Sequence, residues 1–531
     1  MPMLVPTLFS VLFFVALLGL LHVRVHTLLA YFQQEEYEPG RFLAAVGRMR
    51  LYDVISSLVV LVAFALAGML GRFRELALLV SAAAFVLVAL RERRFRFKKP
   101  LALTERVGRL RALALGIAFV LALAVFWWAP LAIIVLQLVP LVIIAANAAL
   151  QPAQERINAR YIAEAREKLA AFEGVKIGVT GSFGKTSVKH ILAQALALDG
   201  NVFFSRGSIN TVLGLTRHIR QRLQPGHKYL IAEMGAYQIG SIERLAEFVR
   251  PEIGIITAVG EAHLERFGSI ENVAQGKSEL AKFVCEHGRL VVTTEAVLKW
   301  RPFNELFTRY KQKFMVIGTS EAADVRILES RLEKEARLIR LDVEGRRLEL
   351  SVPLLASYNA GNIALVVGVV ARIAPEILDS LPALFAKLEQ TPHRLEKKEK
   401  VSAPLLLDDA YNSNETGFQE AVEMLHALAT GRGGKAVLIT PGIVELGERH
   451  EEVHRRLGEL SGRLLDAVYV VNPERIPSFV EGARAGGRAM VETVPRFGDA
   501  QRAADRQFRD TRDVVLYEND LPDVLEETRL L

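Results

Sequence analysis

A glycine-containing loop between an apolar strand and a helix places the tightest limit on how this chain folds. Residues 178–189 read Gly-Val-Thr-Gly-Ser-Phe-Gly-Lys-Thr-Ser-Val-Lys and follow the apolar run that begins at Val175. Glycines in such a loop let backbone N–H groups face an anion at the positive end of the helix. The lysine supplies a charge for the terminal phosphates, and the threonine hydroxyl can ligate Mg²⁺. We therefore expect a nucleotide phosphate site formed by Gly181, Ser182, Gly184, Lys185, Thr186 and Ser187.

The loop departs from the general phosphate-loop pattern at one position. That pattern has a glycine five residues before the Gly-Lys pair, where this chain has Val179. A plain glycine turn is the alternative interpretation. The order strand, loop and helix favours the nucleotide site.

Residues 1–150 are much more apolar than the rest of the chain, which is 51% hydrophobic overall. The stretches Met3–Leu21, Val54–Leu70, Leu76–Leu90 and Ala112–Leu150 are nearly free of charge. The last is too long for one membrane crossing, and Trp127-Trp128-Ala-Pro130 is typical of an interfacial turn. We predict a transmembrane region of about five helices and no cleaved signal peptide. Because these stretches hold few ionisable residues, we expect anchoring or binding of a lipid-linked substrate, and no transport path.

The basic residues predict the orientation in the membrane. The net charge of +7 is concentrated near 91–111, and residues 22–50 hold four arginines. Basic loops beside apolar spans favour the cytoplasmic side and anionic lipid, so we expect no nucleic-acid partner. This places the N-terminus outside and residues 151–531 in the cytoplasm of a multi-pass inner-membrane protein. Arg72 and Arg74, left outside, disagree with this arrangement.

The remaining two thirds have the composition of an ordinary globular chain. Its single cysteine, Cys285, fits a reducing compartment. Residues 151–173 predict a charged amphipathic linker helix. Short β-branched runs alternate with helical patterns beyond it, which indicates an α/β fold with buried strands. We predict a central ATP-binding domain at 174–391 and a smaller Rossmann-like α/β domain at 392–531. The predicted strands are Val175–Thr180, Lys228–Glu233, Ile253–Thr257, Leu290–Thr293, Leu405–Asp408, Ala436–Thr440, Ala467–Val471 and Val514–Leu516.

Four further groups of polar residues can carry chemistry. Glu233 ends a strand, where a carboxylate can hold Mg²⁺ beside phosphates. His263 follows another strand, although an isolated histidine is more often structural. Lys277 lies in a helical segment and by itself fits a solvated lysine. The run Asp-Asp-Ala-Tyr-Asn-Ser-Asn at 408–414 ends a strand and either forms turns or holds a ribose and polar substrate groups.

Together these residues resemble the Mur ligases, most closely the branch that joins D-alanyl-D-alanine to a UDP-muramoyl tripeptide. The order and spacing of the shared stretches also fit, over roughly residues 174–460. The stretches are Gly-Ser-Phe-Gly-Lys-Thr-Ser-Val-Lys (181–189), Ala-Glu-Met-Gly-Ala (232–236), Arg-Pro-Glu (250–252), Ala-His-Leu-Glu-Arg-Phe-Gly-Ser (262–269), Gly-Lys-Ser-Glu (276–279), Asp-Asp-Ala-Tyr-Asn-Ser-Asn (408–414) and Glu-Leu-Gly (445–447).

The resemblance implies an ATP-dependent ligase that forms an acyl phosphate on a substrate carboxylate and transfers the acyl group to an amine. It implies catalytic roles for Lys185, Glu233, His263 and Lys277. Thr186 and Glu233 would hold a first Mg²⁺, and His263 and a carbamylated Lys277 would hold a second. It further assigns Asn359 and Asn362 to the adenine, Arg394 to the phosphates, Asp409 to the ribose, and Asn210, Tyr411, Asn412 and Asn414 to substrate.

The departures from the family concern the substrate. The domain that holds the UDP-sugar is missing, and apolar spans occupy its place. The family's Lys-Gly-Ser-Arg segment is replaced by residues 516–523. We therefore expect a lipid-linked or otherwise membrane-bound acceptor acid in cell-envelope synthesis, joined to an amino acid or dipeptide. The alternatives are a ligase that adds glutamate-like units to another acid, a non-catalytic nucleotide-sensing membrane scaffold, and an ATP-driven transporter, which lacks intramembrane charges.

Overall fold

A computed structural model describes residues 8–521 except Arg72, Arg96, 262–263, 334–335, Asn412 and Glu445. Two compact units make up the chain, the first within Met1–Ile157 and the second spanning Asn158–Asp520. The predicted site residues His263 and Asn412 lie outside the described residues.

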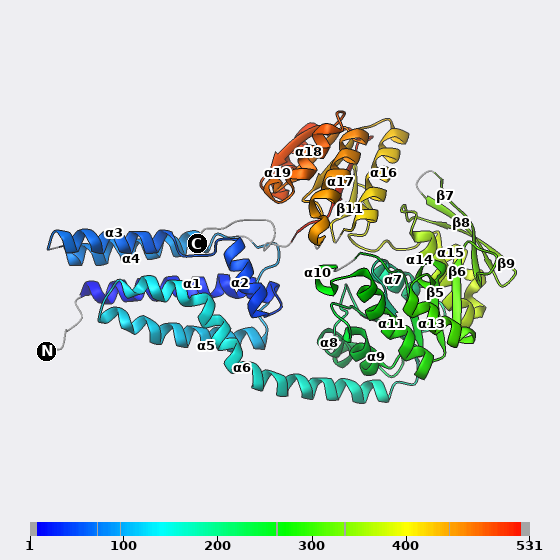
Figure 1. The fold of residues 1–531 in the computed structure, drawn as a ribbon, viewed down its shortest axis with the longest axis horizontal. Helices are drawn as coiled ribbons and strands as arrows, with labels where there is room; N and C mark the ends of the chain where they lie inside the picture. The colour runs from blue at the N-terminus through cyan, green and yellow to red at the C-terminus, as the bar shows by residue number, and fades with distance from the viewer. Residues whose placement is uncertain are drawn as a thin grey trace. The chain divides into compact units, whose positions relative to one another are not determined.

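The first unit is built from apolar helices that pack side by side (Figure 1). Helix α1 contacts α4 and α5, and α3 contacts α4. Large side chains fill the contact, with the rings of Phe13 and Phe85 at 5.2 Å between centroids. The helices are α1 (Leu8–Gln34), α2 (Pro39–Arg48), α3 (Ile55–Met69), α4 (Arg74–Glu92), α5 (Glu105–Ala122) and α6 (Leu131–Ala170).

Three helices of the described residues are long and apolar enough to cross a membrane, by length and composition. They are α1, the segment Glu105–Phe126 and α6. The predicted spans near 54–70 and 76–90 form α3, of 15 residues, and α4, of 19 residues with charged residues at both ends. The turn predicted at Trp127–Pro130 is confirmed, since it separates the 3-10 turn Leu123–Phe126 from α6.

One sequence prediction about this region is wrong, and another is confirmed in part. Residues 22–34, expected in a cytoplasmic loop, continue α1, because their apolar pattern and the ion pairs of Arg24 support a helix. Arg24 is buried and pairs with Asp53 at 3.1 Å and Glu92 at 2.9 Å, so the apolar helices do enclose ionisable groups. The helix predicted at 151–173 is present up to Ala170, but it is continuous with the apolar helix before it. It is the second half of α6, since the rise in charge after residue 150 changes the surroundings of the helix without ending its hydrogen-bond ladder.

The second unit begins with a large sheet flanked by helices. Within the described residues its strand order is β2-β3-β1-β4-β5-β6-β7-β8-β9, parallel up to β7 and antiparallel from β7 to β9. The strands are β1 (Val175–Thr180), β2 (Val202–Phe204), β3 (Tyr229–Glu233), β4 (Ile253–Ile256), β5 (Leu290–Thr294), β6 (Phe314–Gly318), β7 (Val325–Glu333), β8 (Ala336–Val343) and β9 (Arg346–Val352). The helices are α7 (Lys185–Leu196), α8 (Val212–Arg222), α9 (Ser241–Val249), α10 (Leu264–Phe267), α11 (Ile270–His287), α12 (Glu295–Leu298), α13 (Arg301–Arg309), α14 (Asn359–Ile373) and α15 (Leu381–Phe385).

A smaller sheet follows, in the order β10-β11-β15-β12-β13-β14 among the described residues, parallel except for β10. Its strands are β10 (Glu396–Lys398), β11 (Leu405–Asp409), β12 (Ala436–Thr440), β13 (Ala467–Val471), β14 (Met490–Val494) and β15 (Val514–Glu518). Its helices are α16 (Glu415–Arg432), α17 (His450–Leu464), α18 (Pro477–Ala485) and α19 (Phe497–Gln507). The predicted α/β class is confirmed for both sheets.

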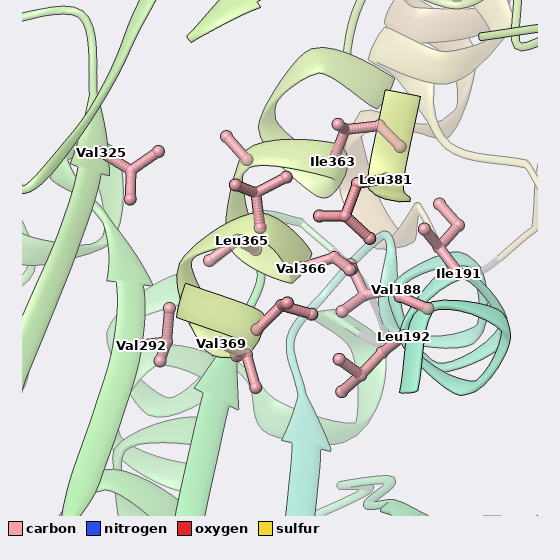
Figure 2. Close-up of a cluster of buried hydrophobic side chains, with 14 of the residues drawn as sticks. Val188, Ile191, Leu192, Val292, Val325, Ile363, Leu365, Val366, Val369 and Leu381 are labelled. Atoms are coloured by element: carbon pink, nitrogen blue, oxygen red, sulfur yellow. The ribbon is translucent and has the colours of Figure 1, made fainter. Parts of the chain in front are cut away.

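Helix α14 secures one face of the large sheet. Its residues Ile363, Val366 and Val369 pack with Val188 and Leu192 of α7 in a buried apolar cluster (Figure 2). Burying a side chain of this size contributes about 1.5–3 kcal/mol. The cluster fixes α7, and with it the loop that precedes α7, against the carboxyl ends of the strands.

Candidate functional site

The predicted phosphate loop connects β1 to α7 and needs its two glycines. Gly184 has φ +78° and Gly181 has φ +150°, conformations that other residues rarely adopt. A Cβ atom on Gly181 would lie 2.0 Å from Thr257 Oγ1, and one on Gly184 would lie 2.6 Å from Asn362 Oδ1. The loop therefore lies tightly between its neighbours, with its N–H groups at the positive end of α7.

Lys185, the first residue of α7, folds back onto this loop. Its Nζ donates to the carbonyl oxygens of Gly181 at 2.6 Å and Ser182 at 3.1 Å. Burial lowers the pKa of Lys185 to about 8, with Glu233 opposing this shift and Arg394 adding to it. The present partners of this ammonium group are neutral carbonyl oxygens. A phosphate group, which carries negative charge, would bind it more strongly.

Glu233 ends β3 beside the loop, since Val179 of β1 is its partner in the sheet register. Its carboxylate is 1% exposed. One oxygen, Oε2, accepts hydrogen bonds from Thr186 Oγ1 at 3.0 Å and from Lys189 Nζ at 2.9 Å. The other, Oε1, lies 3.5 Å from Asn210 Nδ2. Three side chains, two from α7 and one from the segment before α8, thus converge on this carboxylate.

The hydroxyl of Thr186 and the carboxylate of Glu233 fit a Mg²⁺ ion. Octahedral Mg²⁺ binds oxygens at about 2.0–2.1 Å, so adjacent ligand oxygens lie roughly 2.9 Å apart. The observed separation of 3.0 Å between Thr186 Oγ1 and Glu233 Oε2 matches that spacing. Lys189, whose ammonium group contacts the same oxygen, is a residue that the sequence did not single out.

Lys277 lies on α11 and faces the same site. Its side chain is buried, and burial lowers its pKa well below the ordinary lysine value, with the neighbouring charge of Lys185 lowering it further. Burial therefore favours the uncharged amine form of Lys277. A neutral amine is the form that reacts with CO₂ to give a carbamate.

One cavity of about 330 Å³ joins these groups to residues of the second sheet. Both sheets belong to the same compact unit. From the large-sheet side it is lined by Ser182, Gly184, Lys185, Thr186, Ser187, Asn210, Glu233, Lys277 and Asn362, and from the other side by Arg394, Asp409, Tyr411 and Asn414. The predicted site residues that the structure describes therefore lie around one cavity, except Gly181 and Asn359, which are not among the residues that line it.

Asp409 is a carboxylate that lines the cavity from the side of the smaller sheet. Its Oδ1 accepts a hydrogen bond from the backbone N–H of Leu395 at 3.0 Å. Burial raises the pKa of Asp409 to about 6, while the charge of Arg394 opposes the shift. Arg394 in turn lies over the ring of Tyr411, 4.5 Å from its centroid.

Asp408 has a different role from its neighbour. Successive strand residues point to opposite faces, so the two carboxylates separate. Asp408 pairs with His393 at 2.8 Å and with Lys398. Together with Glu396, His393 and Asp408 could hold a metal, but Lys398 already compensates their charge. Asp408 therefore braces the connection between the sheets.

Glu518 is a second buried carboxylate that the sequence missed. It pairs with Asp409 in the register of β15 and β11, and its Oε1 accepts from the Ser413 hydroxyl. Burial raises its pKa well above the usual value, and the charge of Asp409 adds to this. Its Oε2 is buried and has no hydrogen-bond partner among the described residues. The position of Glu518 at the end of a strand could have indicated a site residue. It did not distinguish Glu518 from the many exposed glutamates of the chain.

Three asparagines predicted to bind nucleotide or substrate form hydrogen bonds within the protein. Asn414 caps α16, where its Oδ1 accepts from the Gly417 N–H at 3.0 Å. Asn362 Nδ2 donates to Asn359 Oδ1 at 3.3 Å, and both side chains are buried at the start of α14. A nucleotide or substrate role for these asparagines stays a prediction.

Comparison with known proteins agrees with this geometry. The model of the Mur ligase middle domain matches residues 179–370. The UDP-N-acetylmuramoyl-tripeptide–D-alanyl-D-alanine ligase of Escherichia coli is 29% identical over 53% of this chain and 61% of its own length. The enzyme of the same name from Mycobacterium tuberculosis is 30% identical over 60% of this chain and 63% of its own length. A crystal structure of MurF ligase from Thermotoga maritima in complex with ADP has a TM-score of 0.57 and 28% identity, over 68% of this chain and 80% of that one.

The fold and the site define a nucleotide-binding α/β protein with a phosphate loop at the carboxyl edge of its larger sheet. Residues 179–370 match the Mur ligase middle domain, so the resemblance seen in the sequence is confirmed for the central part of the chain. It spans less than two thirds of the length of these curated relatives.

Proposed function

We propose that this chain is an ATP-dependent amide ligase of the Mur type, anchored in a membrane through its N-terminal helices. The supporting observation is the single cavity that joins the phosphate loop, Glu233 and Lys277 to Arg394 and Asp409 of the second domain. The ADP complex of the Thermotoga relative supports the use of ATP.

In the proposed reaction, the carboxylate of the acceptor acid attacks the γ-phosphorus of ATP, and ADP leaves. The amine then attacks the acyl carbon, and phosphate leaves as the amide forms. Mg²⁺, when bound, would neutralise phosphate charge. The chain's own contribution is to position anions that repel each other: Lys185 and the loop N–H groups hold phosphates, and Arg394 adds a cation from the other side of the cavity.

We assign Lys277 a negative group in the active protein. In its uncharged form, which burial favours, the amine would react with CO₂ to form a carbamate and release a proton, so that the side chain becomes an anionic oxygen ligand. Burial beside Lys185 supports this, because the carbamate would gain a cationic neighbour where the ammonium form has a repulsive one. With His263, the carbamate would complete a second Mg²⁺ site.

For the substrates, the relatives' names indicate a D-alanyl-D-alanine type of amine and a muramoyl-peptide type of acid in peptidoglycan synthesis. We propose an acceptor held at the membrane, because apolar helices precede the central domain of this chain and three of them are long enough to cross a bilayer. The catalytic unit would lie in the cytoplasm, where ATP is present.

The test uses the full chain in lipid nanodiscs with ATP and Mg²⁺. We expect ADP release that requires both an acid and D-alanyl-D-alanine, and that is faster with a lipid-linked muramoyl peptide than with the soluble UDP-linked one. Equal or better turnover of the soluble substrate would contradict the membrane-bound acceptor. ADP release with glutamate in place of the dipeptide would favour the ligase that adds glutamate units. Nucleotide binding without ADP release for any acid and amine pair would favour the scaffold.

A further inference from the structure

Helix α1 carries ionisable side chains on two opposite faces. His22 and His26 are one turn apart and share a face, whereas Arg24 lies about 200° around the helix from His22. Arg24 points into the unit, where Asp53 and Glu92 compensate its charge. Ser56 and Ser57 donate hydrogen bonds to Asp53 in turn. The positive charge on this face of α1 is therefore fully compensated by carboxylates.

The opposite face brings two histidines of α1 close to two arginines, and no carboxylate pairs with these four side chains among the described residues. Arg111 of α5 donates to His22, with 2.8 Å between Nη2 and Nε2. Arg93, at the end of α4, and Arg111 are the charged groups nearest His22, and Arg111 and His22 are those nearest His26. His22 and Arg93 are exposed, and His26 and Arg111 are partly exposed.

The position along the helices matches the edge of a bilayer. The turn after α5 exposes Trp127 and Trp128, residue types that favour a membrane interface. Arg111 precedes Trp127 by 16 positions, which corresponds to about 24 Å along a helix. The hydrocarbon core of a bilayer is about 30 Å thick, so Arg111 lies near the interface opposite the tryptophans.

Apolar side chains lead away from these basic side chains on both helices. On α1, Val15 and Val11 lie two and three turns before His22 and are exposed. Phe119 on α5 and Leu123, the first residue of the 3-10 turn after it, lie eight and twelve positions after Arg111 and are also exposed. The basic side chains can bind an anionic headgroup, and the exposed apolar side chains beside them can contact its hydrocarbon chains. A free anion would gain nothing from these apolar contacts.

We propose that His22, His26, Arg93 and Arg111 bind the phosphate group of a membrane lipid in the cytoplasmic leaflet. The guanidinium groups donate paired hydrogen bonds to phosphate oxygens, and the imidazoles donate further ones. The proposal rests on the membrane insertion that the proposed function includes, and it is independent of the ligation chemistry. Such a site would hold a phosphorylated lipid among the helices of the first unit.

The test measures lipid retention by the full chain in phosphatidylcholine nanodiscs doped with phosphatidic acid, using native mass spectrometry. We expect Arg111→Gln and His22→Gln to weaken retention about tenfold each, as for a lost charge-assisted hydrogen bond. Arg111→Lys, which keeps the charge, should retain most of the binding and shows that the helices still fold. Arg41→Gln is the matched control, because Arg41 of α2 is already paired with Glu35, Glu36 and Glu38.

Equal retention by Arg111→Gln and the unchanged protein would overturn the proposal, as would an equal loss in Arg41→Gln. Competition by inorganic phosphate as strong as that by phosphatidic acid would show an anion site without lipid preference and would also overturn it. Extraction of the chain from membranes by alkaline carbonate would instead contradict the insertion. ADP release by a chain that fails the lipid test would leave the ligase proposal standing.

Discussion

Replacing Asp409 with Asn tests whether the buried carboxylate at the cavity lowers the free energy of unfolding. Asn is nearly isosteric, and its side-chain oxygen can still accept the hydrogen bond from the Leu395 N–H, which measures 3.0 Å in the structure. The substitution therefore removes the charge and preserves the packing. Its effect reports the electrostatic cost of Asp409.

The magnitude follows from the pKa. Burial raises the pKa of Asp409 from 3.8 to about 6. Between these values the folded protein binds a proton that the unfolded chain releases, so stability falls as pH rises through this window. The shift of about 2 pKa units, at 1.36 kcal/mol each, gives a cost on the order of 3 kcal/mol above pH 6, and this cost vanishes below pH 4. Glu518, whose pKa is also raised, adds a cost of the same sign.

The assay is urea unfolding of the full chain in detergent at several pH values, followed by tryptophan fluorescence and circular dichroism. We expect the unchanged protein to lose stability from pH 4 to pH 7, and Asp409→Asn to lose clearly less and to be the more stable protein at pH 7. Glu518→Gln should flatten the profile in the same direction. Asp466→Asn, at a carboxylate whose pKa is lowered by backbone and lysine hydrogen bonds, should do the opposite and cost stability at pH 7. Parallel pH profiles for Asp409→Asn and the unchanged protein would refute the reasoning.

Three further outcomes are expected. Lys277→Ala should reduce ADP formation by orders of magnitude and leave nucleotide binding intact, with partial rescue by acetate and none in Lys277→Arg; full activity in the alanine variant would remove this residue from the site. Gly184→Ala should abolish nucleotide binding, measured by calorimetry, because φ is +78° and the added carbon would lie 2.6 Å from Asn362 Oδ1. Gly431→Ala, in open space on α16, should instead raise stability by about 0.5–1 kcal/mol, and equal losses of nucleotide binding in both glycine variants would contradict the strain at Gly184. A reporter fused after residue 531 that is active only outside the cytoplasm should give no signal, whereas a signal would reverse the predicted orientation.

Short-range patterns in the sequence were sufficient for the buried parallel strands and the phosphate loop. The predicted strands Val175–Thr180, Ala436–Thr440 and Ala467–Val471 coincide with β1, β12 and β13. Their runs of apolar residues are long enough for a strand and are bounded by turn residues, so local preference and burial agree. The glycines of the loop are likewise a local requirement, since they follow from the conformation that the backbone must adopt between β1 and α7.

The antiparallel strands β7 to β9 escaped prediction for the opposite reason. Their residues alternate between buried and exposed and include many charges, such as Arg331 and Glu333, which form ion pairs on the exposed face. A charged alternating segment resembles a solvated helix or loop until a partner strand is known. The change in charge after residue 150 was misleading in the same way, because α6 continues through it.

The sequence by itself determined which residues can bind phosphate and metal, because that depends on residue type and local backbone. The tertiary structure decided which carboxylates and amines act together. Asp408 and Asp409 are equivalent in the sequence, but the alternation of the strand directs one to Lys398 and the other to the cavity. Lys189, Lys277 and Glu518 resemble solvated charges, and their burial against Glu233, Lys185 and Asp409 changes their proton affinity. Coulomb interactions and desolvation act through space, so distances along the chain do not determine them.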